Sequence, residues 1–181
     1  MHKTMLRSRP CRSPHPAEYL VLSASLRGAS LSRRMAEALL EAYARLGAAV
    51  TLVDLREYVL PLCDGEAAYA HPHVATLSAL VERARVIILA TPIYNFDANA
   101  TAKNLLELTG SAWEDKTVGF LCAAGGVSSY MSIMGLANSL MLDFRCLIIP
   151  RFVYAAAMTS PRRARPERSC CSASSTWPPR R

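Results

Sequence analysis

Apolar residues occur along the middle of the chain in two alternating patterns. Short, mostly apolar runs, typical of strands buried in a parallel sheet, lie at residues 19–22, 50–55, 86–90, 117–122 and 146–149. Between these runs the apolar positions recur every three to four residues, which predicts helices over residues 30–46, 73–85, 99–108 and 129–142. Strands that alternate with helices indicate an α/β domain, in which helices cover both faces of a doubly wound parallel sheet. We expect Thr91-Pro92 to end the third strand.

Charge changes this picture only at the two ends of the chain. The 181 residues carry a formal net charge of +7. Residues 1–16 contain four basic side chains and no acidic one, and residues 161–181 contain six arginines and one glutamate. Residues 17–160 contain eleven basic and thirteen acidic side chains. A nucleic-acid-binding domain carries a basic excess in its folded part, so we expect no nucleic-acid partner; a nucleic-acid-binding tail over 161–181 is an alternative that rests on charge alone.

Three segments follow from the patterns. Residues 1–16 contain three prolines and no hydrophobic periodicity, which is typical of a disordered arm. Residues 17–160 are expected to form the α/β domain. Residues 161–181 present no apolar face and are predicted to be disordered, which leaves the fifth strand without a following helix. A shifted reading frame after about Ser160 is one hypothesis for the abrupt change in composition.

Two further features bear on the location of the protein. Residues 117–142 contain no charged residue or histidine and are long enough to span a bilayer. Gly125-Gly126 interrupts this run and several serines follow, so a buried strand, a turn and a helix explain it better. The N-terminal residues lack the apolar stretch of a secretory signal, and no two of the six cysteines have C-x-x-C spacing. We expect a reduced, cytoplasmic protein with neither a membrane span nor a metal site.

The first strand runs into a loop rich in hydroxyl groups. Ser25, Arg27, Ser30 and Ser32 stand there just before a predicted helix. The positive end of a helix dipole, backbone N–H groups and serine hydroxyls together suit an anion such as a phosphomonoester. The loop has neither the G-x-x-x-x-G-K-[ST] pattern of nucleotide triphosphate sites nor the G-x-G-x-x-G pattern of dinucleotide sites. The alternative is that these serines only cap the helix.

Two more loops follow the third and fourth strands. Pro92, Tyr94 and Phe96 follow the third strand, and the two aromatic rings offer flat apolar faces to a planar ligand; alternatively, they pack on the next helix. Gly125 and Gly126 follow the fourth strand, where they let the backbone approach a ligand closely, unless they form an ordinary strand-to-helix turn. With strand order 2-1-3-4-5 all three loops lie at one edge of the sheet, at its switch point.

Taken together, the three loops resemble those of the NADPH-dependent FMN reductases of the flavodoxin-like superfamily. That family's phosphate loop reads G-S-L-R-x-x-S-x-N, where this chain has ASLRGASLS at residues 24–32. Its second loop reads P-E-Y-N with a later K-N, where this chain has PIYN at 92–95 and KN at 103–104, and its Gly-Gly turn matches Gly125-Gly126. The resemblance covers about residues 17–155. It implies a flavodoxin-like, doubly wound, five-stranded parallel sheet.

The chain departs from the family pattern at three places. Ala24 and Ser32 stand where the phosphate loop has a glycine and an asparagine, and Ser32 can still donate a hydrogen bond. Ile93 replaces a glutamate, so any contact of that carboxylate is lost. The family closes its sheet with a helix after the fifth strand, whereas the tract that begins at Pro161 has no helical period; the final helix is therefore expected to be missing or replaced.

The resemblance implies an FMN-binding oxidoreductase that passes hydride from NADPH or NADH through bound FMN to free flavin, a quinone or a similar small-molecule acceptor. In that role the phosphate would be held by Ser25, Arg27, Ser30 and Ser32. The isoalloxazine ring would be flanked by Pro92, Tyr94 and Asn95, and approached at its other edge by Gly125 and Gly126. No general acid or base is implied, because the cofactor supplies the chemistry. The family commonly forms dimers or tetramers, so a homodimer or homotetramer is expected.

A non-enzymatic electron carrier or flavin-binding protein of the same fold is the alternative. Such carriers are strongly acidic, which helps to steer them to their redox partners. Residues 17–160 have only two more acidic than basic side chains. This near-neutral balance favours the enzyme.

Overall fold

The computed structural model describes residues 19–156, so the expectations for residues 1–16 and 161–181 lie outside the described part of the chain. Five strands form the main path of the sheet: β1 Tyr19–Ser23, β2 Val50–Asp54, β3 Val86–Tyr94, β5 Thr117–Ala124 and β6 Leu147–Ile148. They are parallel and lie in the order β2-β1-β3-β5-β6. This order confirms the predicted 2-1-3-4-5 arrangement. Two short strands extend the sheet: β4 Asp97–Ala98 pairs with β3, and β7 Val153–Ala156 pairs with β5.

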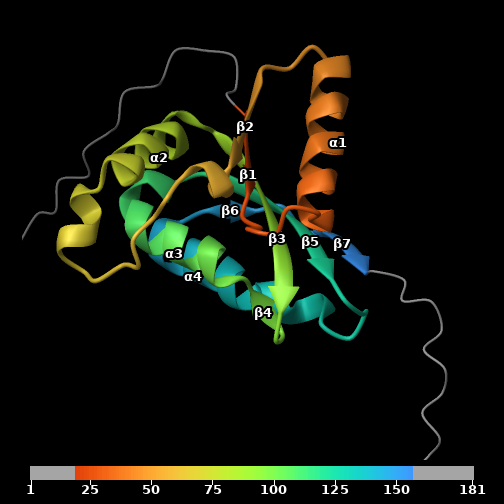
Figure 1. The fold of residues 1–181 in the computed structure, drawn as a ribbon. Helices are drawn as coiled ribbons and strands as arrows, with labels where there is room; N and C mark the ends of the chain where they lie inside the picture. Colours follow the sequence, from red (N-terminus) through yellow and green to blue (C-terminus); the bar gives the residue numbers. More distant parts are fainter. Residues whose placement is uncertain (1–18, 157–181) are drawn as a thin grey trace, which may run out of the picture.

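The four predicted helices are present and lie on the two sides of the sheet. They are α1 Leu31–Arg45, α2 Pro72–Arg83, α3 Ala100–Thr109 and α4 Met134–Phe144. Short 3-10 turns precede or follow them at Leu55–Glu57, Ala67–Ala70, Gly110–Trp113 and Tyr130–Ile133. Among the described residues, α1 is the one helix on its side of the sheet, whereas α2, α3 and α4 lie together on the other side (Figure 1). The fold is therefore a doubly wound α/β sheet, as expected.

Alternate side chains along each strand enter two separate cores, because successive strand residues point to opposite faces. The larger core receives Leu20, Leu22, Ile87 and Leu89 and packs them against α2, α3 and α4. The smaller core receives Val21, Ile88, Ala90 and Leu121 and packs them against α1. Cys122 lies in the larger core, where burial raises the pKa of its thiol to about 12. The thiol therefore stays protonated at neutral pH and packs as a small apolar group.

Strand β3 continues past Thr91-Pro92, so the prediction that these residues end it was wrong. The backbone carbonyl of Ala90 accepts from the N–H of Ala24 on the β1 side, and Pro92, two residues further on, faces the same side. There β1 has already ended, so the missing N–H of Pro92 breaks no bond with β1. The carbonyl of Pro92 instead accepts from the N–H of Asn99 at 3.2 Å. The longer strand carries Ile93 and Tyr94 to the edge where the loops meet.

The strand predicted at 146–149 is present as the short β6, and a further strand, β7, which was not predicted, follows it. Strand β6 pairs with the start of β5, and β7 pairs with the end of β5. Between the two strands stand Pro150, which has no N–H to donate, and Arg151, whose φ is +60°. At these residues the backbone leaves β5, and it pairs with β5 again at β7. The interruption is tolerated because β6 and β7 lie at the edge of the sheet.

Helix α4 starts later than predicted. The helix expected from residue 129 begins at Met134, after the 3-10 turn Tyr130–Ile133. Ser129 does not cap a helix; its Oγ lies 2.7 Å from the Oη of Tyr154 on β7. The run over 117–142 is thus a buried strand, a turn and a helix, as the interpretation of its glycines and serines required. Within residues 19–156 no helix has the length and apolar character needed to cross a bilayer.

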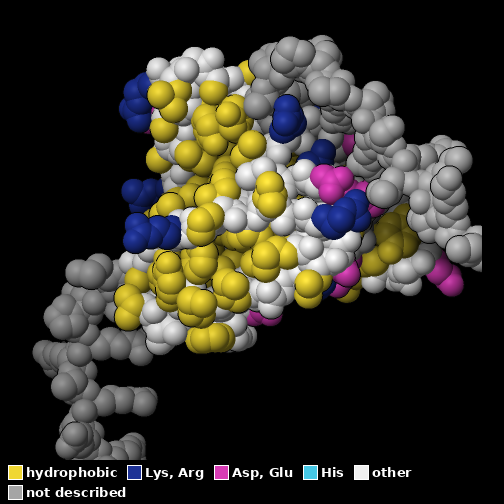
Figure 2. Space-filling view, turned by 180° about the vertical axis from the view of Figure 1, so that it is seen from behind, with side chains coloured by type: hydrophobic (Ala, Val, Ile, Leu, Met, Phe, Trp, Pro, Cys, Tyr) yellow, Lys and Arg dark blue, Asp and Glu magenta, His cyan; other side chains and the backbone are white. Residues whose placement is uncertain are grey.

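One half of the sheet has no helix on the α1 side within residues 19–156. The outermost strand exposes Leu147, Ile149 and Val153, at 70%, 39% and 55% of their surface. Their partners in β5, Thr117 and Leu121, point to the α1 side, so these three side chains do as well. The rear view shows a broad band of hydrophobic side chains on the surface (Figure 2). The segment in which the family has its closing helix lies outside the described residues.

Candidate flavin site

Three loops meet at the carboxyl ends of the adjacent strands β1, β3 and β5, as the strand order requires. They enclose a pocket of about 310 Å³. Seven of the nine predicted site residues line it: Ser25, Arg27, Ser30, Ser32, Pro92, Tyr94 and Gly125. The other two, Asn95 and Gly126, lie next to lining residues. Four lining residues were not predicted: Leu31, Ile93, Ala123 and Ala124.

The first loop presents its hydroxyl groups at the start of α1. Ser25, Ser30 and Ser32 are almost fully buried, with 1%, 4% and 0% of their surface exposed. Ser30 is the N-cap of α1: its Oγ accepts from the N–H of Arg33 at 3.3 Å, and it lies 2.9 Å from Ser32 Oγ. Ser25 Oγ accepts from the N–H of Arg27 at 3.3 Å. The loop is thus held by its own hydroxyls, next to helix N–H groups that have no intrahelical acceptor.

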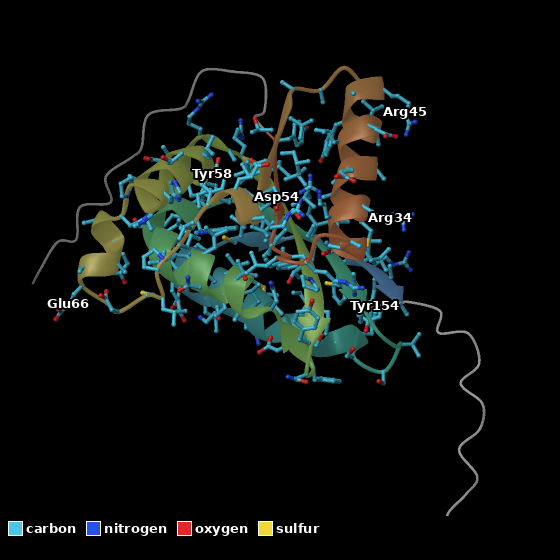
Figure 3. All side chains as sticks on the ribbon, viewed as in Figure 1. Arg34, Arg45, Asp54, Tyr58, Glu66 and Tyr154 are labelled. Carbon is cyan, nitrogen blue, oxygen red and sulfur yellow. The ribbon has the colours of Figure 1, made fainter. Side chains whose placement is uncertain are left out.

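Two arginines behind this loop share one buried carboxylate. Asp54, at the end of β2, is 5% exposed and lies beside the start of α1 (Figure 3). It accepts from Nε and Nη2 of Arg56 at 2.9 and 2.6 Å, and it pairs with Nη1 of Arg33 on α1. Arg33 Nε also pairs with Oε1 of Glu37 at 2.8 Å, so two cations and two anions balance in this group. The group therefore ties the start of α1 to the end of β2 and adds no net charge behind the loop. Charge counting along the chain had not revealed the group, because Asp54 is 21 residues from Arg33.

The second loop is a tight β-hairpin between β3 and β4. Tyr94 and Asp97 are paired, and the two residues between them, Asn95 and Phe96, have φ values of +51° and +66°. Such two-residue turns need positive φ at both central positions, which asparagine tolerates and phenylalanine rarely adopts. The side chains of Tyr94 and Phe96 are 54% and 60% exposed. Tyr94 forms part of the pocket rim and Phe96 follows two residues later in the turn; this much exposure leaves little of either ring packed on the next helix.

Below this rim the lining is apolar. Pro92 and Ile93 are buried and face the pocket together with Tyr94. Because Ile93 stands where the family has a glutamate, this wall carries no charge. Flat rings and aliphatic side chains of this kind suit one face of a planar aromatic ligand.

The third loop leaves open space beside the pocket. A Cβ placed on Gly125 or Gly126 would meet no atom within 4 Å, so a ligand can approach this turn. The carbonyl of Gly126 accepts from the Oη of Tyr154 at 2.7 Å, and Tyr154 lies on β7 where the turn after β5 passes (Figure 3). Sequence patterns had missed Tyr154, because β7 itself was not predicted. Its contact holds the Gly-Gly turn in place from 28 residues away.

The donors and surfaces of the pocket fit FMN. One end offers hydroxyls, a guanidinium and a helix N-terminus, which are the groups that bind a phosphomonoester. The other end offers an apolar wall and an exposed aromatic rim, which suit a flavin ring. A single molecule with a phosphate at one end and a planar ring at the other matches both ends.

Comparisons with known proteins agree with this geometry. A model of the family "NADPH-dependent FMN reductase" matches residues 18–160. An NADH:FMN oxidoreductase (EMOB, apo form) superimposes with a TM-score of 0.66 and 17% identity, over 77% of this chain and 75% of that one. The flavoenzyme FerB from Paracoccus denitrificans, an NAD(P)H:(acceptor) oxidoreductase, gives a TM-score of 0.63 and 21% identity, over 75% and 78%. Azoreductase AzrA superimposes with a TM-score of 0.59 and 18% identity, over 76% of this chain and 85% of that one.

The two kinds of match carry different information. At these identities the structural neighbours establish the fold, which is flavodoxin-like. The family model covers most of the chain, including all three loops that line the pocket. It confirms the resemblance read from those loops. The chain therefore belongs to the NADPH-dependent FMN reductase family and is a flavin-dependent oxidoreductase.

Proposed function

We propose that the protein passes hydride from NADPH or NADH through bound FMN to free flavin, a quinone or a similar small-molecule acceptor. The observation that carries this proposal is the two-ended pocket at the switch point of the sheet. Its polar end lies at the α1 N-terminus and its apolar end lies along β3 and the β3–β4 turn.

In this proposal the first loop binds the FMN phosphate. The groups that hold it are Ser25, Arg27, Ser30 and Ser32. Asp54 and its two arginines hold the start of α1, and with it these residues, against the end of β2. Charge-assisted hydrogen bonds of this type are worth about 1.5–3 kcal/mol each, so the phosphate contributes much of the affinity.

The second and third loops bind the ring. Pro92 and Tyr94 lie against one side, and Gly125 against the other edge, where the open turn leaves room. Asn95 shapes the hairpin that holds Tyr94 in position, and Gly126 is held by Tyr154 at the margin of the ring site. None of these groups is placed to transfer a proton. Their contribution is to bind and orient the ring and to exclude water from its buried side.

FMN held by these residues would supply the redox chemistry, taking hydride from a reduced nicotinamide and passing electrons to an acceptor. The chain serves both steps by leaving the rim open, since Tyr94 and Phe96 are more than half exposed. Donor and acceptor can therefore approach the same side of the ring one after the other. The uncharged Ile93 gives this rim an apolar floor, which favours flat, poorly hydrated acceptors such as flavins and quinones.

We further propose that the protein is a cytoplasmic homodimer or homotetramer. The exposed Leu147 and Val153 support association, because large apolar residues that share a face are usually covered. Free thiols at Cys63, Cys122 and Cys146 support a reducing compartment.

The proposed function is tested by reduction of the bound flavin without a partner protein. The purified protein loaded with FMN should show the visible absorption of oxidised flavin. Addition of NADPH or NADH under argon should bleach it, and oxidised flavin or quinone should restore it, repeatedly. A flavin that stays oxidised in an excess of both nucleotides would support the electron carrier instead and contradict the proposal.

A further inference from the structure

The first two loops of the site are joined by one buried side chain, that of Asn99. Asn99 is the N-cap of α3 and only 6% of its surface is exposed. Its Nδ2 donates to the carbonyl of Ala24 at 2.7 Å, across 75 residues of sequence. Its Oδ1 accepts from the hydroxyl of Thr91 at 2.9 Å and from the N–H of Ala102 at 3.4 Å. One amide therefore contacts the end of β1, the end of β3 and the start of α3.

Two of these partners, Ala24 and Thr91, each adjoin a residue that lines the pocket. Ala24 immediately precedes Ser25, and its own N–H donates to Ala90 at 2.9 Å in the last bond between β1 and β3. Beyond that bond the two strands separate, and the amide of Asn99 is the next connection between them. Thr91 precedes Pro92, whose carbonyl accepts from the backbone N–H of Asn99 at 3.2 Å. The bridge formed by Asn99 therefore lies where two loops separate: the phosphate loop, which begins at Ser25, and the ring loop, which begins at Pro92.

The polar side-chain atoms of Asn99 and Thr91 in this bridge all have a partner, which makes it rigid. Thr91 is fully buried, and its one hydroxyl proton has two acceptors within reach, the amide oxygen at 2.9 Å and the carbonyl of Pro92 at 3.2 Å. The carbonyl of Ala24 is also buried, so the loss of its partner would leave an unpaired acceptor away from water. Buried polar networks in which every member is paired fix one geometry. A helix cap alone would not need the bond to Ala24.

We propose that Asn99 is a positioning residue that holds the phosphate loop in register with the ring loop, so that the two ends of FMN are bound together. The inference rests on the proposed function of the pocket as an FMN site. Without the bridge, Ser25 and Arg27 shift relative to Pro92 and Tyr94. The phosphate and the ring then no longer reach their partners at the same time, and the advantage of FMN over riboflavin falls.

The test replaces Asn99 by a residue that still caps the helix. Asn99→Ser keeps a good N-cap for α3, but the shorter side chain cannot reach Ala24. Thr91→Val is the milder second variant, which keeps the shape of the side chain and removes only its hydroxyl. Asn104→Ser is the matched control: Nδ2 of Asn104 donates to Pro61 and its Oδ1 accepts from the N–H of Cys63, both at 2.9 Å, so it joins α3 to a loop outside the pocket.

The measurement is the dissociation constant of FMN and of riboflavin for the full chain and each variant, together with the melting temperature without flavin. We expect Asn99→Ser to weaken FMN at least tenfold and riboflavin by less than threefold, with Thr91→Val a smaller change in the same direction. Asn104→Ser should leave the ratio of the two constants within twofold of wild type, whatever its melting temperature.

Two results would overturn the inference. The first is an unchanged ratio in Asn99→Ser, or in Thr91→Val if Asn99→Ser does not fold, because a structural role lowers stability without changing discrimination. The second is an equal fall of the ratio in the Asn104→Ser control. Failure of the wild-type chain to bind either flavin is a different outcome, since it overturns the proposed function and this inference with it.

Discussion

Ser30 has two roles that looked like alternatives in the sequence. Its Oγ caps α1 by accepting from the N–H of Arg33, and the same hydroxyl lines the pocket beside Ser32. A hydroxyl has one proton to donate and two lone pairs with which to accept, so capping uses only part of its capacity. The helix cap and the anion ligand are therefore compatible functions of one residue. The loop pattern predicted both, because both follow from hydroxyls placed before a helix.

Phe96 is the residue whose backbone fits its position least well. It occupies the second central position of the β3–β4 turn with φ +66°, and its ring is 60% exposed. A left-handed backbone costs a residue with a side chain about 1–2 kcal/mol. Glycine avoids this cost, but it loses more conformational entropy on folding than other residues, which offsets part of the gain in stability.

We therefore expect Phe96→Gly to raise the free energy of unfolding by about 1 kcal/mol, as measured by chemical denaturation without flavin. Asn95→Gly, at the other central position, is the control and should change stability less, because asparagine tolerates this backbone. A clear loss of stability in Phe96→Gly would mean that the ring contributes packing that its exposure does not indicate.

At the scale of elements, hydrophobic periodicity predicted what depends on local pattern. The buried strands and the helices α1, α2 and α3 lie where the apolar repeats place them, because burial on a sheet or a helix face requires that spacing. The errors lie where tertiary contacts overrule local signals. Pro92 continues β3 because β1 has ended beside it.

The edge strand illustrates the same limit. Pro150 and Arg151 break it into β6 and β7, and nothing in a short apolar run indicates that the chain returns to the same neighbour. The same difference between local pattern and distant contacts applies to the site. Its lining residues could be predicted from motifs beside strand ends, whereas the supporting residues Asp54, Asn99 and Tyr154 could not, since their partners are distant in sequence.

At the scale of the whole molecule, the sheet is covered unevenly. Helix α1 covers β1, β2 and β3 on its side, and the outer strands expose Leu147, Ile149 and Val153 beyond it. Exposed apolar groups that share one face favour association in water. In the proposed oligomer this face lies in the contact between copies.

We expect the full chain to sediment as an oligomer at micromolar concentration, and Leu147→Lys or Val153→Lys to shift it toward monomer. Leu142→Lys is the matched control, because Leu142 is 81% exposed but lies on α4, across the sheet. Analytical ultracentrifugation measures the distribution. A monomeric wild type, or an equal shift in the control, would exclude this face as the contact.

The central claim is that one pocket binds a phosphate at the α1 N-terminus and a flavin ring along β3. The most direct test is the ratio of the riboflavin and FMN dissociation constants for the wild-type chain, measured by quenching of flavin fluorescence. Because charge-assisted hydrogen bonds contribute about 1.5–3 kcal/mol each, FMN should bind at least tenfold more tightly. Arg27→Gln should lower this ratio, whereas Arg34→Gln, on an exposed part of α1 outside the pocket (Figure 3), should not. Equal affinity for the two flavins would contradict the account.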